Sequence, residues 1–142
     1  KKTVIIYSGT DMSRVVSSRW KTQINENAKS KAFIGNLPEV HHNEILSWDA
    51  DKNGSKENFI VIFIRDQNEH PQIRKRFELT KDLIEENVNI TEVNIANQES
   101  TLKTLLELVL LGDLVSLNLA AKLAVNPNNI DTIEKLKKLL GG

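Results

Sequence analysis

The sequence predicts an α/β fold in which helices cover both faces of a mainly parallel β-sheet. Two observations lead to this prediction. Short apolar runs alternate along the chain with longer segments of helical periodicity, as expected for successive β–α units. In addition, residues 59–64 (FIVIFI) are all apolar and four of them are β-branched, which is typical of a parallel strand buried on both faces. We therefore expect a three-layer sandwich that forms a single domain over residues 1–142.

Four short apolar segments predict the strands of this sheet. Each is closed by a turn signal or by polar residues. The first is followed by Ser8-Gly9-Thr10, and Pro38 follows the second, where it disfavours helical backbone in the preceding residue. The expected strands cover residues 4–7, 32–35, 59–64 and 88–95.

Helical periodicity predicts most of the connecting segments. Val16, Trp20 and Ile24 recur on one face of the first helix. Pro71 fits the first turn of the next helix, where its missing N–H has no cost. The expected helices cover residues 11–29, 71–84, 102–124 and 130–140, with one or two turns in residues 41–48. The polar stretch 49–57 (DADKNGSKE) is expected to be a surface loop, because it contains Gly54 and has few apolar residues.

The segment 102–124 is the most apolar part of the chain. It is apolar nearly all round, which predicts burial inside the domain or against a partner subunit, and Gly112 predicts a bend or division. Four charged residues interrupt it, so no uncharged run approaches the ~20 residues that a bilayer requires. They are Lys103, Glu107, Asp113 and Lys122. We expect neither a membrane segment nor a signal peptide; the missing initiator Met suggests a fragment or an excised domain.

Composition excludes several classes of function. The chain has 19 Lys and Arg against 19 Asp and Glu, and its formal net charge is zero. This balance gives no electrostatic footprint for nucleic acid or acidic membranes. The absence of Cys removes thiol catalysis, iron–sulfur clusters and Cys-based zinc sites.

The most informative stretch is residues 19–48. It contains RWKTQINENAK (19–29), then LPE (37–39) and then HNEI (42–45). In this order it resembles the C-terminal sugar-isomerase (SIS) domain of bifunctional phosphoglucose/phosphomannose isomerases. A weaker similarity continues through LGDLVS, LA and NP, which occupy residues 111–116, 119–120 and 126–127. The chain departs from the family pattern at AKLA (121–124), where a leucine-arginine-glycine pattern is more usual.

The resemblance implies a sheet of five strands and an aldose–ketose isomerase that converts glucose 6-phosphate or mannose 6-phosphate to fructose 6-phosphate. In the family a carboxylate moves a proton between C1 and C2 through a cis-enediol, after a histidine assists ring opening. The Asn-Glu-Asn motif makes Glu26 the base, and the His-Asn-Glu motif makes His42 the ring-opening histidine. An assisting lysine near the C-terminal helix corresponds to Lys122, although a shift of one residue in the alignment would place Ala121 there.

Elementary chemistry is consistent with these roles. A base that takes a carbon-bound proton must be ionised yet poorly solvated. Histidine is suited to passing a proton to a ring oxygen near neutral pH, and a lysine steadies negative charge on enediolate oxygens. Each residue also has a plainer interpretation. Without the motif, Glu26 reads as a solvated helix glutamate, and Lys122 as a lysine whose ammonium reaches water from an apolar helix.

Other polar and aromatic residues favour structural roles. The cluster around His41 and His42 lacks the spacing that places two metal ligands on one helical face. Ser8-Gly9-Thr10 could cradle a phosphate at a helix N-terminus, although such a turn is expected in any α/β fold. We expect His41 to be an ordinary loop residue and His70 a surface residue. We expect Trp20 and Trp48 to lie in the core or at an interface.

The resemblance also implies partners. The family has two SIS domains in one chain, and this sequence corresponds to the second, without the Ser/Thr-rich phosphate loop of the first. We expect a phosphorylated hexose substrate, the N-terminal SIS domain of the same protein, a homodimer that exchanges the histidine, no metal or other cofactor, and a cytoplasmic location. The chain alone is expected to be inactive. The alternatives are a non-catalytic sugar-phosphate-binding or regulatory domain, and a dimerisation module. Substrate-binding residues are not identifiable.

Overall fold

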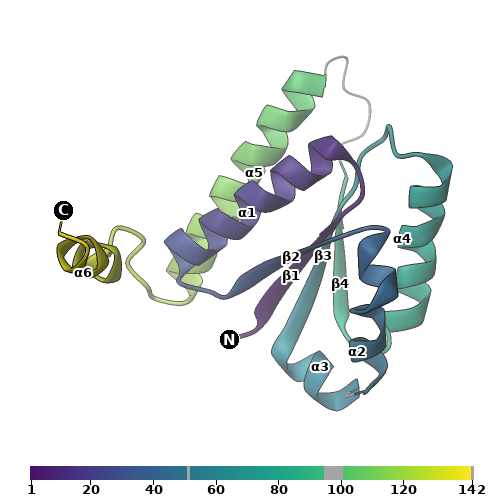
Figure 1. The fold of residues 1–142 in the computed structure, drawn as a ribbon, viewed down its shortest axis with the longest axis horizontal. Coiled ribbons are helices and arrows are strands. Elements are labelled where there is room, and N and C mark those ends of the chain that lie inside the picture. Colours follow the sequence, from purple (N-terminus) through teal and green to yellow (C-terminus); the bar gives the residue numbers. More distant parts are fainter. Residues whose placement is uncertain (51, 95–100, 142) are drawn as a thin grey trace.

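The computed structural model describes residues 1–50, 52–94 and 101–141. Within these ranges the chain forms a parallel sheet flanked by helices (Figure 1). The strands are β1 (Thr3–Ser8), β2 (Ala32–Asn36), β3 (Phe59–Ile64) and β4 (Asn89–Val93). The helices are α1 (Asp11–Ala28), η1 (Glu39–His42, a 3-10 turn), α2 (Ile45–Ala50), α3 (Lys52–Asn58), α4 (Pro71–Ile84), α5 (Thr101–Lys122) and α6 (Asp131–Leu139).

The sheet has the strand order β2-β1-β3-β4, and every neighbouring pair is parallel. The family resemblance implies five strands, whereas the described residues form four. The expected strand 88–95 is found as β4 over Asn89–Val93, and the end of the expected range, from residue 95, lies outside the described residues.

Side chains alternate between the two faces of the sheet, as the period of two requires. On β1, Val4 and Ile6 face α1 and α5, whereas Tyr7 faces α2 and α4. Each face therefore has its own apolar cluster, and both are apolar because helices cover both sides. Figure 1 shows α1 and α5 on one side of the strands and α2 and α4 on the other. The predicted three-layer α/β sandwich is confirmed.

The predicted surface loop 49–57 is wrong. α2 continues to Ala50, and α3 occupies Lys52–Asn58. Two observations show that this polar segment is held by the rest of the chain. Ser55 is buried, and Lys2 Nζ donates a hydrogen bond to the Lys56 carbonyl oxygen at 2.7 Å. Tertiary contacts thus override a weak local signal.

The predicted bend of the apolar helix at Gly112 is also wrong, because α5 is one continuous helix. Gly112 instead allows a close approach to α1. A Cβ atom there would lie 2.5 Å from Trp20 Nε1 and 2.9 Å from Gln23 Oε1. Only a glycine fits between the two helices at this point.

The burial predicted for α5 holds for one face only. Leu108 and Ala120 are buried, and Trp20 Nε1 donates a hydrogen bond to the Leu108 carbonyl oxygen at 2.8 Å. Six leucines of the helix are nevertheless exposed; they are Leu102, Leu106, Leu110, Leu111, Leu114 and Leu117. By length and composition alone, the stretch Leu102–Lys122 would be long and apolar enough to cross a membrane. In this structure the helix packs along α1, and the two helices together cover one face of the sheet.

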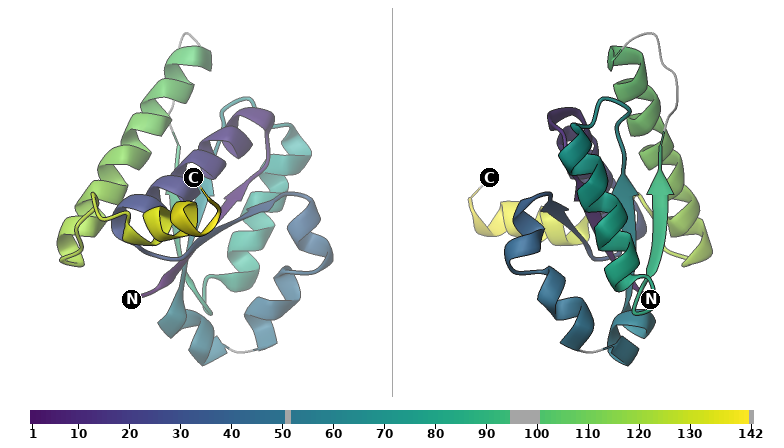
Figure 2. Two further views of the ribbon diagram at one scale, coloured as in Figure 1. Left: turned by 60° about the vertical axis from the view of Figure 1, so that its left-hand side comes forward. Right: turned by 90° about the vertical axis from the view of Figure 1, so that its right-hand side faces the viewer.

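α6 lies outside the three layers, beside the C-terminal end of α1 (Figure 2). The helix was predicted from the apolar positions Ile130, Ile133, Leu136 and Leu140, and it is present. All of its residues are exposed. Its apolar stripe therefore has no cover within the described part of the chain.

Candidate active site

Glu26 lies in the last turn of α1, at the edge of a cavity of about 700 Å³. The cavity is formed by the C-terminal end of α1, the segment that joins α5 to α6 and the first turn of α6. Most of its polar lining consists of hydroxyl and amide side chains. The lining residues are Thr22, Asn25, Glu26, Lys29, Val125, Asn126, Asn129, Ile130, Thr132 and Ile133. Glu26 is exposed, so this chain alone does not give it the poorly solvated environment that a carbon-acid base requires.

The two asparagines beside Glu26 fix the end of α1. Asn25 Oδ1 accepts a hydrogen bond of 2.8 Å from the backbone N–H of Ala32, at the start of β2. Asn27 Nδ2 donates a hydrogen bond of 2.8 Å to Ser116 Oγ on α5. The Asn-Glu-Asn motif thus clamps α1 to its neighbours on both sides while its central carboxylate faces the cavity. The sequence analysis did not identify the roles of the asparagines, although the motif contains them.

Lys29 is the cation in the cavity that contains Glu26. It is the C-cap of α1 and has left-handed backbone, with φ 49° and ψ 33°, a conformation that costs a non-glycine residue about 1 kcal/mol or more. Its ammonium donates hydrogen bonds to the carbonyl oxygens of Glu26 and Pro127, the latter at 3.2 Å. A cation is favourable at a helix C-terminus. Lys29 also ties α1 to the opposite wall of the cavity, a role that the sequence analysis missed.

The expected assisting lysine, Lys122, is the last residue of α5 and is exposed. It lines a different cavity, of about 620 Å³, between α5 and the sheet. Lys1 and Lys2 line the same cavity. The structure therefore does not bring Lys122 into the cavity that contains Glu26.

His42 is the last residue of η1 and is exposed. η1 follows the carboxyl end of β2, and its Val40 belongs to the apolar cluster on the α2/α4 face. α1 starts at the same edge of the sheet but lies on the other face, and Glu26 is 15 residues into it, about 22 Å along the helix axis. Within one chain, Glu26 and His42 therefore lie on opposite faces of the sheet.

The turn at residues 8–10 is used for helix capping. Thr10 is the N-cap of α1, and its Oγ1 accepts from Ser13 N at 3.2 Å. Ser13 Oγ accepts from the N–H groups of Gly9 and Thr10 at 3.1 and 3.0 Å. Thr10 Oγ1 donates to Asp66 Oδ2 at 2.9 Å. The N–H groups of Gly9 and Thr10 and the Thr10 hydroxyl thus already donate hydrogen bonds within the protein. The buried Asp66 carboxylate would also repel a phosphate bound at this turn, because both are negatively charged. This arrangement disfavours the phosphate cradle that the sequence suggested.

Among the described residues, no group of three or more His, Asp or Glu side chains is placed to hold a metal ion. The two tryptophans are buried, as expected: Trp20 lies between α1 and α5, and Trp48 lies against Tyr7. His70 is exposed and caps α4, where its Nδ1 accepts from Gln72 N at 3.2 Å.

Comparison with known proteins gives closely related sequences. The chain is 35% identical over 136 residues to the bifunctional phosphoglucose/phosphomannose isomerase of Aquifex aeolicus, covering 96% of this chain and 42% of that protein. The protein of the same name from Caldicellulosiruptor bescii is 34% identical over 139 residues, with 98% and 41% covered. A D-glucosamine-6-phosphate 4-epimerase from Sulfolobus acidocaldarius is 30% identical over 132 residues, with 89% and 38% covered. The chain thus spans about two fifths of the length of the curated relatives it matches.

The fold is found among solved structures as well. The glucosamine-6-phosphate deaminase of Thermotoga maritima superposes with a TM-score of 0.63, at 17% sequence identity, over 89% of this chain and 38% of that one. At this identity the similarity concerns the fold alone. The family model described as the bacterial phospho-glucose isomerase C-terminal SIS domain matches residues 1–140. This chain therefore belongs to the bacterial phosphoglucose isomerase C-terminal SIS domain family.

Proposed function

We propose that this chain is the part of a phosphohexose isomerase that supplies the acid–base residues for converting glucose 6-phosphate or mannose 6-phosphate to fructose 6-phosphate. The observation that carries the proposal is the placement of Glu26. In a chain of this family, its carboxylate lies between two hydrogen-bonded asparagines at a cavity large enough for a hexose phosphate. Apolar side chains such as Ile130 and Ile133 also line this cavity, and its polar lining consists mainly of hydroxyl and amide groups. Such groups suit a polyol.

In the proposed mechanism, Glu26 removes the C2 proton of the open-chain aldose, a C1=C2 double bond forms, and the carbonyl electrons move to O1 to give a cis-enediolate. A proton then passes from the O2 hydroxyl to O1. The protonated Glu26 returns its proton to C1 as the C2 carbonyl forms, which yields the ketose. His42 transfers a proton to the ring oxygen in the preceding ring-opening step. General acid–base groups of this kind contribute roughly 10²- to 10⁴-fold each.

Two partners complete the proposed site. Glu26 is exposed in the single chain, so a companion N-terminal SIS domain would cover it, exclude water and bind the phosphate. His42 lies on the other face of the sheet, so it would reach the substrate of a second subunit in a homodimer. The length of the curated relatives supports the companion domain, and a metabolic enzyme of this kind would act in the cytoplasm.

Lys122 remains a proposal for the assisting lysine, and Lys29 competes with it. Lys29 shares the cavity with Glu26, whereas Lys122 does not. Lys29→Met and Lys122→Met remove one ammonium each with little change in side-chain volume. If position in the cavity decides the role, Lys29→Met lowers the isomerase kcat more than Lys122→Met does. The opposite order would favour Lys122.

The test is a coupled assay of fructose 6-phosphate formation by the complete gene product, with glucose 6-phosphate and mannose 6-phosphate as substrates. Glu26→Gln should lower kcat by about 10²- to 10⁴-fold. Asp11→Asn is a matched control, because Asp11 is an exposed carboxylate at the other end of α1. In D₂O, deuterium should appear at C1 of the fructose 6-phosphate, as proton transfer through an enediol requires.

Other outcomes identify the alternatives. Full activity in Glu26→Gln would contradict the assignment of the base. A folded wild-type protein that binds sugar phosphates without turnover would indicate a binding or regulatory domain, and failure to bind any would indicate a dimerisation module. Epimerisation of glucosamine 6-phosphate at C4 without ketose formation would indicate the activity that the name of the Sulfolobus relative describes.

A further inference from the structure

Two residues close to His42 in the sequence, His41 and Glu44, are hydrogen-bonded to the α2/α4 face of the fold. His42 ends η1 and is exposed, whereas Val40, two residues earlier, is 2% exposed. His41 contacts α4, and Glu44 contacts β1. The exposed His42 therefore lies in a segment that hydrogen bonds hold to both α4 and β1.

The hydrogen bonds of His41 have only one consistent direction. Arginine can only donate, so His41 Nδ1 accepts from Arg76 Nη1 at 2.9 Å. The Nε2–H group of His41 then donates to Thr80 Oγ1 at 2.7 Å. Thr80 Oγ1 donates in turn to the Arg76 carbonyl oxygen at 2.7 Å. His41 is thus a neutral imidazole in one tautomer, and it joins η1 to α4.

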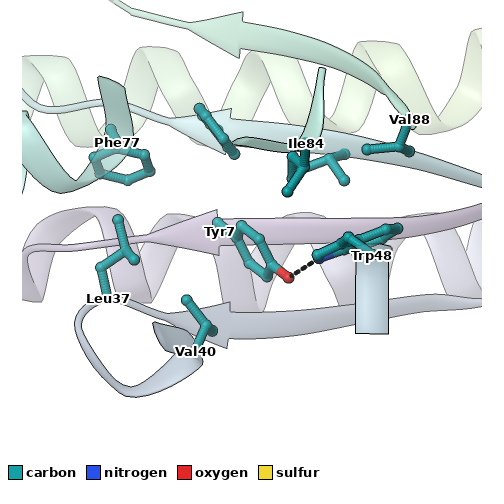
Figure 3. Close-up of a cluster of buried hydrophobic side chains, with 9 residues drawn as sticks. Tyr7, Leu37, Val40, Trp48, Phe77, Ile84 and Val88 are labelled. Carbon is teal, nitrogen blue, oxygen red and sulfur yellow. Dashed lines mark hydrogen bonds between the residues drawn. The ribbon is translucent and has the colours of Figure 1, made fainter. Parts of the chain in front are cut away.

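The hydrogen bonds of Glu44 are equally determined. The indole of Trp48 can only donate, and its Nε1 donates to the hydroxyl of Tyr7 at 3.0 Å. Tyr7 then donates to Glu44 Oε2 at 3.2 Å. Tyr7 and Trp48 are both buried, and Figure 3 shows the bond between them inside the apolar cluster, next to Val40. Burial and the Glu44 carboxylate raise the pKa of Tyr7, so its hydroxyl remains a donor.

We propose that His41 and Glu44 are positioning residues for His42. They fix the turn so that the His42 imidazole is directed away from its own core, and this inference rests on the proposed function, in which His42 serves the site of a second subunit. Loss of either anchor would leave the fold standing but would allow the imidazole to move. A misplacement of about 1 Å can cost roughly 10²-fold in rate.

The experiment compares Glu44→Ala with Glu44→Gln in the complete gene product. Glutamine keeps an oxygen that accepts from Tyr7, so Glu44→Gln should retain kcat within about threefold, whereas Glu44→Ala should lose about 10- to 100-fold in kcat with KM nearly unchanged. In a His42→Ala background, Glu44→Ala should have no further effect, because interacting residues are not additive. His41→Ala, which removes the other anchor, should behave like Glu44→Ala.

The outcomes separate this inference from the proposed function. Full kcat in Glu44→Ala together with a large loss in His42→Ala would overturn the positioning role alone. Additive losses in the double variant, or an equal loss in Glu44→Gln, would overturn it too. Full kcat in His42→Ala would overturn both the positioning role and the assignment of His42. Full kcat in Glu26→Gln concerns the proposed base and not the anchors.

Discussion

The two faces of the sheet differ in how fully their polar groups are paired and their apolar side chains are covered. We call the α2/α4 side the complete face and the α1/α5 side the incomplete face. On the α2/α4 face, aromatic rings pack closely, with centroids 6.1 Å apart for Tyr7 and Phe63 and 5.1 Å apart for Phe63 and Phe77. Both faces contain polar contacts, but on the α1/α5 face the side-chain amide of Gln23 is buried without a hydrogen-bond partner among the described residues. The outer side of α5 exposes a row of leucines.

This difference divides the candidate catalytic groups. The complete face holds the anchors of His42, and the incomplete face carries Glu26. A residue that must reach another site benefits from a rigid support within its own chain. A base that must be shielded from water can lie on a face that another domain covers. Four predictions test this division, in order of decreasing expected effect.

The largest effect is expected at Phe77, in the centre of the complete face. Phe77 is fully buried, and the guanidinium carbon of Arg65 lies 4.5 Å from the centre of its ring. Phe77→Ala should lower the free energy of unfolding by about 3 to 5 kcal/mol, as measured by urea unfolding. Leu83→Ala on the same helix is the control, because Leu83 is 66% exposed and its loss should cost less than about 0.5 kcal/mol. Equal losses would contradict a core centred on Phe77.

The second prediction compares two leucines of α5. Leu108 is fully buried against α1, whereas Leu110 is 57% exposed. In the 142-residue chain, Leu108→Ala should cost about 2 to 5 kcal/mol and Leu110→Ala less than about 0.5 kcal/mol. Urea unfolding of both variants checks this.

The same pair in the complete gene product sharpens the comparison. If a companion domain or a second subunit covers the outer side of α5, Leu110→Ala becomes destabilising there, because it then removes a buried side chain. An unchanged effect would show that this side of α5 stays exposed. A large effect already in the 142-residue chain would contradict the described packing.

The third prediction concerns the close contact between α1 and α5. A methyl group on Gly112 would meet the ring nitrogen of Trp20, which is buried and hydrogen-bonded to α5. Gly112→Ala should therefore destabilise the chain by about 1 to 3 kcal/mol, although alanine favours a helix by about 1 kcal/mol. Thermal unfolding, with Asn118→Ala at an exposed position of the same helix as the control, measures the difference. A stabilised Gly112→Ala variant would mean that the helices lie further apart.

The strands and the main helices could be located along the chain from periodicity, because both faces of β1 and β3 are apolar and α1 has a clear apolar stripe. The order of the strands within the sheet was not predicted. The helix α3 could not, because its polar residues are held by contacts with residues far away in the sequence, such as Lys2. Gly112 was ambiguous for the same reason: a glycine in a helix signals either a bend or a close neighbour, and only Trp20 decides which.

The candidate site was predicted in part. The motifs point to Glu26 and His42 as candidates, an assignment that stays a prediction. Periodicity does not show which cavity a lysine side chain lines, so the cavity of Lys29 and that of Lys122 could not be distinguished from the sequence. The partners of His41 lie on α4, more than 30 positions along the chain. The sequence analysis therefore treated His41 as an ordinary loop residue.

The smallest expected effect is a pH dependence of the free energy of unfolding, caused by His41 on the complete face. Burial, followed by the charges of Arg76 and His42, lowers the pKa of His41 below its usual value of 6.5. As pH falls below about 6.5, the unfolded chain binds a proton at this position before the folded chain does, and the contribution of His41 to stability is lost progressively until the pKa of the folded state is passed. The stability difference between the chain and His41→Gln should therefore shrink between pH 7.5 and pH 5.

Urea unfolding at several pH values measures this difference, and a titration of the His41 imidazole by NMR gives the pKa in the folded chain directly. A protonated His41 would present an N–H group to Arg76, which can itself only donate, so the bond between η1 and α4 would break. A stability difference that stays constant or grows on acidification would contradict the neutral, singly oriented imidazole. The corresponding contacts of α1 with α5, such as Asn27 with Ser116, contain no histidine, so Asn27→Ala should show no such dependence in this range.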